Sequence, residues 1–525
     1  MRRAVALVAL VLFSLPLVGC ATSALTMAPD RPDSPWTPAT SPNGEIVPGE
    51  RAAPEQPMSS TYVLPPNHDL AGIPPPSSDL ERHRAYSLPE LIDIAQSNNP
   101  ATRVAWDDAR TAALVAGIAE STFLPIVSAG IVEGYQKVHN TLSLPGVASG
   151  SSDVTTQGNI SVLAIQWLLF DFGERWALLD VAKQGSVISN IAFTAVHQQV
   201  IYNVSLAFYA NAAARARLAS TAQSLRDAEE VQAAAQDRYK HGNGTVVEVA
   251  QTRQATAQAR LERVQAEGAA QNTYQALIAA MGISPMTRLT IADISRRRLS
   301  AAMIAPVDRI VSAALAQRPD MLTGYAAQQA SLANLRAAQA EFLPKVFVAA
   351  NGTRGVGSLN VTAIPGINEQ LPVVNLPGNQ LGSSIKDELG GTVLLGATVP
   401  VYDGGFRAAL LAQARDKVDK ADATLTQIRN EAVRQIVVAR NTLTTSLSAY
   451  NASTALAAAA QTTFNAALAA YRNGVGAISD VTTAERQLLA AKNAATDSYS
   501  TALSAAATLA LATGLLGSTP NRVER

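Results

Sequence analysis

Two long stretches of the chain are rich in alanine and contain no proline. Such stretches predict helices, and a helix of about sixty residues is roughly 100 Å long, more than the width of a globular domain. A narrow stripe of mainly apolar positions, spaced three and four residues apart, follows each stretch and is typical of coiled-coil packing. The stripe positions are Ile201, Val204, Phe208, Asn211, Arg215 and Leu218 in the first stretch, and Val433, Ile436, Arg440, Leu443, Leu447 and Tyr450 in the second.

A ten-residue pattern interrupts each long stretch and occurs twice, at Tyr239 to Glu248 and, 232 residues later, at Tyr471 to Asp480. In both copies tyrosine is followed by two glycines and then by a carboxylate. Glycine adopts the positive φ angles that a tight turn needs, so each pattern predicts the bend of a helical hairpin. The glycines are Gly242, Gly244, Gly474 and Gly476. The repetition indicates a duplicated unit.

Each copy opens with two shorter helices whose ends are marked by prolines. Ser87, with Glu90 three residues later, forms a capping-box pattern that predicts the first helix start. In both copies, 25 residues separate the proline before the second helix from the proline after it. These prolines are Pro100 and Pro125 in the first copy, and Pro319 and Pro344 in the second.

Two apolar runs of about ten residues follow the second proline of each copy. The runs are Ile126 to Gln136, Asn159 to Phe170, Val346 to Arg354, and Gly391 to Tyr402. They predict strands, and their length suits a tilted membrane-crossing strand. Polar residues within them favour a barrel with one wet face, and a soluble four-stranded sandwich is the alternative. The second copy has a longer loop between its runs, around Gly355 to Glu388.

Four membrane-crossing strands cannot form a closed barrel, because open sheet edges are not viable in lipid and the smallest such barrels have eight strands. If the strands cross a membrane, the chain must therefore associate. A dimer would supply eight strands, a trimer twelve and a tetramer sixteen. The pattern predicts a mainly α protein with a membrane β-barrel, built from a duplicated helix-strand-strand-helix chain.

The N-terminus is similar to a bacterial lipoprotein signal. Two arginines precede an apolar segment, Ala4 to Leu15, that is too short for a spanning helix. The sequence Leu-Val-Gly-Cys ending at Cys20 resembles a lipobox, whose cysteine becomes the lipidated N-terminus. An ordinary buried cysteine is the alternative. Residues 1–19 are interpreted as a signal peptide. The resemblance to bacterial lipoproteins implies that Ala21, rather than Asp, after the cysteine favours sorting to the outer membrane over the inner.

Residues 20–85 are interpreted as the lipidated cysteine and a proline-rich tether. Residues 21–85 contain 13 of the 27 prolines and no apolar periodicity. A segment of this kind lacks backbone donors, so we expect it to be extended. An ordered belt around the body is the alternative.

The composition excludes several classes of function. Lys+Arg and Asp+Glu both number 41, so the chain lacks the electrostatic footprint of a nucleic-acid-binding protein. The 5 histidines are scattered, and a single cysteine leaves no Cys-based metal site. No nucleophile, phosphate loop or metal-ligand spacing accompanies them. We therefore expect no enzymatic activity, no cofactor and no nucleic-acid partner.

Taken together, these features resemble the TolC-like outer-membrane factors, the outer-membrane efflux protein family. The resemblance rests on the lipobox, the duplicated plan, the Leu-Pro entries to the strands, the Tyr-x-x-Gly turns, and the Asp-x-Gly-x-Arg exits at Asp171 and Asp403. The lipoprotein start is similar to the OprM-like branch. The implied parts are a first repeat at 86–290, a linker at 291–305, a second repeat at 306–514 and a short tail at 515–525.

The resemblance implies a homotrimer in the outer membrane of a Gram-negative bacterium. Its twelve-stranded barrel would continue across the periplasm as a long α-helical coiled-coil tunnel. Such a protein is the passive exit duct for small molecules in a tripartite efflux system, with a periplasmic adaptor (membrane fusion protein) and an inner-membrane pump as partners. Type I protein secretion is an alternative within the export class. A structural or adhesive coiled-coil lipoprotein is an alternative of another class.

The carboxylates of the two repeated turns are the main candidate site residues. Each lies in the first turn of a returning helix, where it can complement the helix dipole. Alternatively, association turns one acid into a ring, which attracts cations at a constriction. The resemblance implies that Asp480 lines the pore and that Tyr471 contacts Glu248, so that the turn from Tyr239 to Glu248 holds the gate.

The turn residues depart from the family pattern at two positions. Gly476 occupies the place of a gating arginine, and Thr483 that of a second ring acid, which leaves a simpler constriction at Asp480. The resemblance also implies that the turn glycines, Gly242, Gly244, Gly474 and Gly476, meet the adaptor. Asp171 and Asp403, at the strand exits, are expected to be helix N-caps.

Overall fold

In the computed structural model, the described residues are 38–51, 63–72, 84–142, 150–294, 307–361, 383–386 and 389–517, with a few single positions between these ranges. The chain divides into two compact units between Ser77 and Ser78. In the first unit, β1 (Pro38–Thr40) and β2 (Ile46–Arg51) pair antiparallel, and η2 (His68–Leu70) is a short 3-10 helix. The sequence predicted no element in this proline-rich segment.

Each repeat of the second unit opens with two helices joined at a proline. These are α3 (Leu88–Asn98) and α4 (Pro100–Ser121) in the first repeat, and α7 (Val307–Gln317) and α8 (Pro319–Ala340) in the second. The predicted capping box is confirmed, because the Ser87 N–H donates to the Glu90 carboxylate over 2.8 Å. Pro100 and Pro319 begin α4 and α8, where the missing N–H costs no intrahelical bond.

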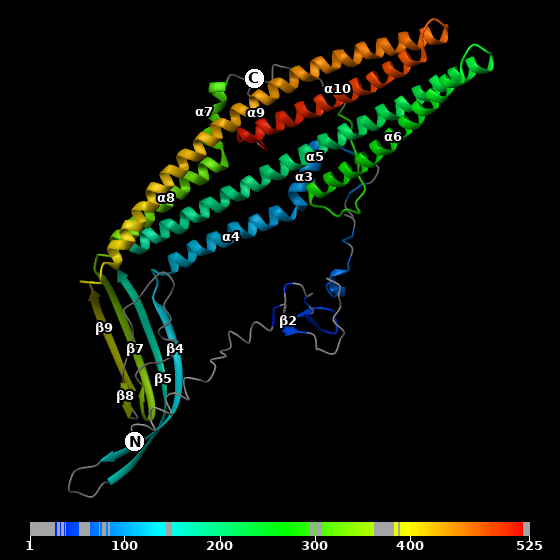
Figure 1. Cartoon of the computed structure of the whole chain (residues 1–525). Coiled ribbons are helices and arrows are strands. Elements are labelled where there is room, and N and C mark those ends of the chain that lie inside the picture. The colour runs from blue at the N-terminus through cyan, green and yellow to red at the C-terminus, as the bar shows by residue number, and fades with distance from the viewer. Residues whose placement is uncertain are drawn as a thin grey trace, which may run out of the picture. The chain divides into compact units, whose positions relative to one another are not determined.

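Four long strands form one antiparallel sheet in the order β4-β5-β7-β9, with the short β8 beside β9 on β7 (Figure 1). Their bounds are Ile126–Leu142 for β4, Gly150–Phe170 for β5, Lys345–Val361 for β7, Ser383–Lys386 for β8 and Leu389–Thr398 for β9. The β5–β7 pair joins the two repeats. Within the described part of the chain, β4 and β9 are the outer strands of the sheet.

The four predicted strands are all present, but their predicted lengths were partly wrong and a fifth strand was missed. β4, β5 and β7 have 17, 21 and 17 residues rather than about ten, because pairing continues through polar residues beyond the apolar runs. β9 ends at Thr398, before the predicted Tyr402, and Pro400 lacks the N–H that would extend the ladder. β8, which was not predicted, lies within the long loop of the second repeat.

Two long helical hairpins extend from the sheet. α5 (Glu174–Lys240) and α9 (Phe406–Arg472) have 67 residues each, which corresponds to roughly 100 Å. They return as α6 (Val246–Met281) and α10 (Ile478–Ala512). The strands lie at one end of this unit and both hairpin turns at the other (Figure 1). The duplicated helix-strand-strand-helix plan is thus confirmed.

The predicted apolar stripe is largely correct along both helices, since Ile436, Leu443 and Leu447 of α9 are buried and its other stripe positions are partly buried. In α5 the first four stripe positions, from Ile201 to Asn211, are buried, whereas Arg215 is exposed. In α9 the buried positions include Ala432 and Ala439, which the stripe did not contain. Alanine presents little bulk, so neighbouring helices approach closely on faces that carry few large apolar side chains.

Candidate channel gate

The two hairpin turns have the same backbone and use their glycines in two different ways. Gly242 and Gly474 have φ angles of 77° and 79°, in the left-handed region that favours glycine. Gly244 and Gly476 do not, so the expectation of positive φ at all four was wrong. At these two positions space is the constraint: a Cβ on Gly244 would lie 2.9 Å from the Tyr239 nitrogen, and one on Gly476 would lie 3.0 Å from a neighbouring Cβ.

The carboxylates that follow the two turns have different surroundings. Glu248 takes part in a capping box with Thr245, in which each side chain accepts the other residue's N–H over 3.2 Å. α10 begins after Ala477 and has no side-chain cap. Asp480 is exposed in its first turn and lies 3.4 Å from the Ser479 hydroxyl, which donates to it. Glu248 is therefore held by its helix, whereas Asp480 faces outward.

The two turn tyrosines also differ. Tyr471 is 1% exposed and belongs to a cluster at the hairpin ends, whereas Tyr239 is 50% exposed. Burial, followed by the negative charge of Glu248, raises the pKa of the Tyr471 phenol. The Glu248 carboxylate is therefore close enough to act on the Tyr471 hydroxyl, although no hydrogen bond of normal geometry joins the two groups. Tyr239 has no comparable environment in one chain.

Arg238 makes a contact between the two turns that the sequence did not predict. One of its terminal nitrogens donates to the Tyr471 carbonyl over 2.5 Å, and the other donates to the Asn243 carbonyl over 3.1 Å. Its guanidinium also lies 4.7 Å from the centroid of the Tyr471 ring. The same position of the second repeat holds Ala470. This difference between the repeats is visible in the sequence, but the partner of Arg238 is not.

Other polar contacts also cross between the hairpins, among them the following two. The Arg472 side chain at the end of α9 forms an ion pair with Glu230 of α5. Farther along, Glu485 of α10 is only 6% exposed, and the Ser224 hydroxyl of α5 donates to it over 3.3 Å. Burial raises the pKa of Glu485 to about 7, and the negative charges of Asp227 and Glu262 act in the same direction.

At the opposite end of the helices, an Asp-Arg pair joins each strand exit to a helix end. The Asp171 carboxylate accepts from the Arg175 backbone over 2.9 Å and from its side chain over 2.7 Å. Arg175 also donates to the Thr122 carbonyl at the end of α4. In the second repeat Arg407 forms the same contacts with Asp403.

The N-cap prediction for these aspartates requires a correction of position. Gly173 and Gly405 are the N-cap residues of α5 and α9, and both have left-handed backbones, with φ of 96° and 89°. Asp171 and Asp403 lie two residues earlier. Their carboxylates still accept N–H groups of the first turn, because the left-handed glycine folds the chain back over the helix end.

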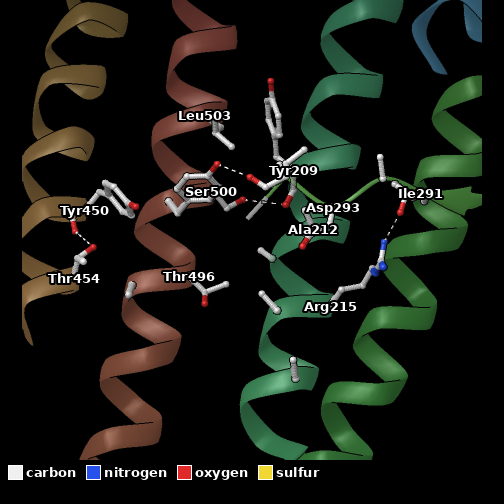
Figure 2. A pocket seen from close by; sticks show the side chains of 17 residues that line it. Tyr209, Ala212, Arg215, Ile291, Asp293, Tyr450, Thr454, Thr496, Ser500 and Leu503 are labelled. Atoms are coloured by element: carbon white, nitrogen blue, oxygen red, sulfur yellow. Dashed lines mark hydrogen bonds between the residues drawn. The ribbon is translucent and has the colours of Figure 1, made fainter. Parts of the chain in front are cut away.

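Midway along the helices, a pocket of about 570 Å³ lies between α5, α9, α10 and the segment after β6 (Thr290–Ile291) (Figure 2). Tyr499 donates to the Ile294 carbonyl over 2.8 Å, and Arg215 donates to the Ile291 carbonyl over 2.9 Å. These bonds hold the segment against the helices. The sequence predicts only a linker at residues 291–305.

Three remaining points concern metal ligands, membrane-crossing helices and the expected lipidation site. Among the described residues there is no cluster of ligand side chains that could hold a metal ion. None of the helices in this part of the chain combines the length and the hydropathy that a membrane crossing requires. Cys20, the expected lipidation site, lies outside the described residues.

A duplicated chain with four long antiparallel strands at one end and two long helical hairpins extending from them has the architecture of an outer-membrane channel protomer. The model of the family described as "Outer membrane efflux protein" matches residues 91–283 and 310–515, so the chain belongs to this family. Its function is that of an outer-membrane efflux channel.

Relatives and solved structures agree with this assignment. The chain is 26% identical over 364 residues to the protein CyaE of Bordetella pertussis, which is 68% of each chain. It is 25% identical over 388 residues to the outer membrane protein OprJ of Pseudomonas aeruginosa, or 74% of this chain and 75% of OprJ. The structure of VceC from Vibrio cholerae has the same fold, with a TM-score of 0.65 at 19% identity, covering 81% of this chain and 96% of VceC.

Proposed function

We propose that three copies of this chain form the passive outer-membrane duct of a tripartite efflux system, closed at its periplasmic end by a constriction at Asp480. The observation that supports this proposal is the exposed carboxylate of Asp480. Asp480 lies at the end of the helices opposite the strands. Three such acids around an axis would attract cations and repel anions. Glu248 cannot replace it, because its carboxylate is engaged in the capping box.

Two groups of partners follow from this proposal. A periplasmic adaptor would meet the turn glycines, where Gly242 and Gly474 expose the backbone, and an inner-membrane pump would supply the cargo and the energy. The chain itself would be a conduit and not an enzyme. In support, the matched family is that of outer-membrane efflux channels.

Asp480→Asn is expected to reduce the preference for cations over anions, because the substitution removes one negative charge per copy from the constriction. Reversal potentials in planar bilayers under a salt gradient measure this preference. Asp497→Asn is the matched control, since Asp497 lies on the same helix but is paired with Arg217. Unchanged selectivity in Asp480→Asn would remove this residue from the gate.

Cys20→Ser is expected to abolish incorporation of labelled palmitate. The chain has a single cysteine, so no other thiol is present to which the lipid could be attached. Wild-type protein labelled in parallel is the reference. Persistent labelling of the serine variant would show that the lipid is attached elsewhere and that the proposed division into residues 1–19 and 20–85 is incorrect.

A further inference from the structure

A cavity of about 490 Å³ lies between α5, α6 and α10 and is called the α5–α6–α10 cavity below. Its lining extends from Thr482 to Asn493 along α10 and from Ala255 to Ala269 along α6. At about 1.5 Å of helix rise per residue, the cavity is elongated along the helices by roughly 15–20 Å. Asp480 is not among the residues that line it, so the cavity is distinct from the proposed constriction.

Glu485 contributes a buried carboxylate to the lining of this cavity. A carboxylate can accept about four hydrogen bonds. Within the described part of the chain, Glu485 accepts only one, from the Ser224 hydroxyl over 3.3 Å, which is long for a bond between two oxygens. No ion pair of Glu485 occurs there either. Burying a carboxylate with so few partners is unfavourable for its charged form, which is why its pKa is raised to about 7.

Two further hydrogen-bond acceptors line the same cavity. The Oδ1 atom of Asn493 is buried and has no hydrogen-bond partner in the described part of the chain. Glu485 and Asn493 are eight positions apart on α10, or roughly 12 Å along its axis. Glu262 faces the cavity from α6, and its carboxylate accepts from Gln258 over 2.9 Å. The cavity therefore has acceptors at both ends of an elongated space and lacks donors for them.

The remaining lining combines small apolar side chains with two arginines. The alanines are Ala255, Ala259, Ala266, Ala269 and Ala490. Arg217 is engaged outside the cavity, because its side chain donates to Asp497 over 2.8 Å. Arg486 is exposed to solvent and is the weakest of the charged neighbours that act on Glu485. The arginines therefore leave the charge of Glu485 largely uncompensated, and the alanines provide an apolar wall between the acceptors.

We propose that the α5–α6–α10 cavity binds a linear aliphatic polyamine, with one ammonium group at Glu485, another at the Asn493 Oδ1 atom, and the methylene groups against the alanines. An ammonium group carries a positive charge and three N–H donors, so it supplies what both acceptors lack. A hard metal ion fits less well, because it needs six or more oxygen ligands, and the described residues contain no cluster of ligand side chains.

Spermidine is the probe for this site, titrated into the purified full-length protein in detergent at low salt and followed by isothermal titration calorimetry. Glu485→Gln is expected to weaken binding about tenfold or more, because the amide keeps the shape of the side chain and loses its charge. Glu267→Gln is the matched control, since Glu267 is an exposed acid of α6 that does not line the cavity. Absence of binding to the wild type, or equal weakening in both variants, would overturn the proposal.

Proton release gives a readout that a merely structural role of Glu485 would not produce. Because the pKa of Glu485 is about 7, an ammonium group that binds its carboxylate should release about half a proton per ligand near neutral pH. Titrations in two buffers with different enthalpies of ionisation measure this release, which should vanish in Glu485→Gln. Release that persists in this variant would assign binding to another group.

Ala266→Leu tests the location of the ligand without removing a charge. Ala266 is half-buried and lines the cavity from α6, so the larger side chain occupies part of the space for the methylene groups. Weaker binding of spermidine is expected, with a circular dichroism spectrum like that of the wild type. Unchanged affinity in a folded Ala266→Leu protein would place the ligand outside the cavity and contradict the proposal.

Discussion

Arg175→Ala is expected to lower the free energy of unfolding by about 3–5 kcal/mol, the usual cost of removing one partner from a buried ion pair. Arg175 and Asp171 both have side chains that are 4% exposed. The arginine also donates to the Thr122 carbonyl over 2.9 Å and lies 4.8 Å from the Phe123 ring. Its loss would leave the Asp171 charge buried and would detach the end of α4 from the start of α5.

The second repeat provides the control for this prediction. Arg407 forms the equivalent pair with Asp403, but these side chains are 10% and 27% exposed, so water can solvate the charge that remains. Arg407→Ala should therefore have a smaller effect. Denaturant-induced unfolding in detergent micelles, followed by circular dichroism, measures both variants. Equal losses would show that burial does not distinguish the two junctions.

Glu485→Gln is expected to remove a pH dependence of stability that the wild type shows between about pH 4.5 and pH 7. Burial raises the pKa of Glu485 from 4.5 to about 7. Below pH 4.5 the carboxyl is protonated in both states, so its stabilising contribution is fully present. As the pH rises towards 7, the unfolded chain releases the proton first and the folded state loses up to about 3 kcal/mol of relative stability.

The polar and charged groups around Glu485 shift its pKa in different directions, and one of them, Glu262, provides a control variant. Ser224 and Asp227 face it from α5, Glu262 faces it from α6, and Arg486 is its neighbour on α10. The two acids raise the pKa further, while Ser224 and Arg486 lower it. Glu262→Gln should leave most of the pH slope in place, because the dominant cause is burial of Glu485 itself. A slope that persists in Glu485→Gln would assign the titration to another group.

The helices were predictable from the sequence because their ends depend on local chemistry. Ser87 with Glu90 begins α3, and Pro100 and Pro319 begin the next helices of the two repeats. Each of these signals acts within one turn of its own helix. The strands were less predictable, since their length depends on cross-strand pairing. Polar segments of β4 and β5 pair with each other far beyond the apolar runs.

The contacts of the proposed gate were only partly predictable from the sequence. The repeated pattern identified Tyr471, Asp480 and their counterparts, because a repetition at a fixed spacing can be read without coordinates. Arg238 lies one residue outside that pattern, and its partner is a backbone carbonyl 233 residues away. A main-chain acceptor leaves no signature in the sequence, so this contact required the structure.

The sequence by itself determined the duplication, the helical hairpins, the turns and the family, since all of these depend on local residue chemistry or on comparison of the chain with itself. Only the tertiary structure decided which copy of each repeated residue is buried. Tyr471 and Tyr239 occupy equivalent positions, yet one is covered by the facing hairpin and the other is half exposed. Burial depends on which neighbour is present, and within a single chain each repeat has a different neighbour.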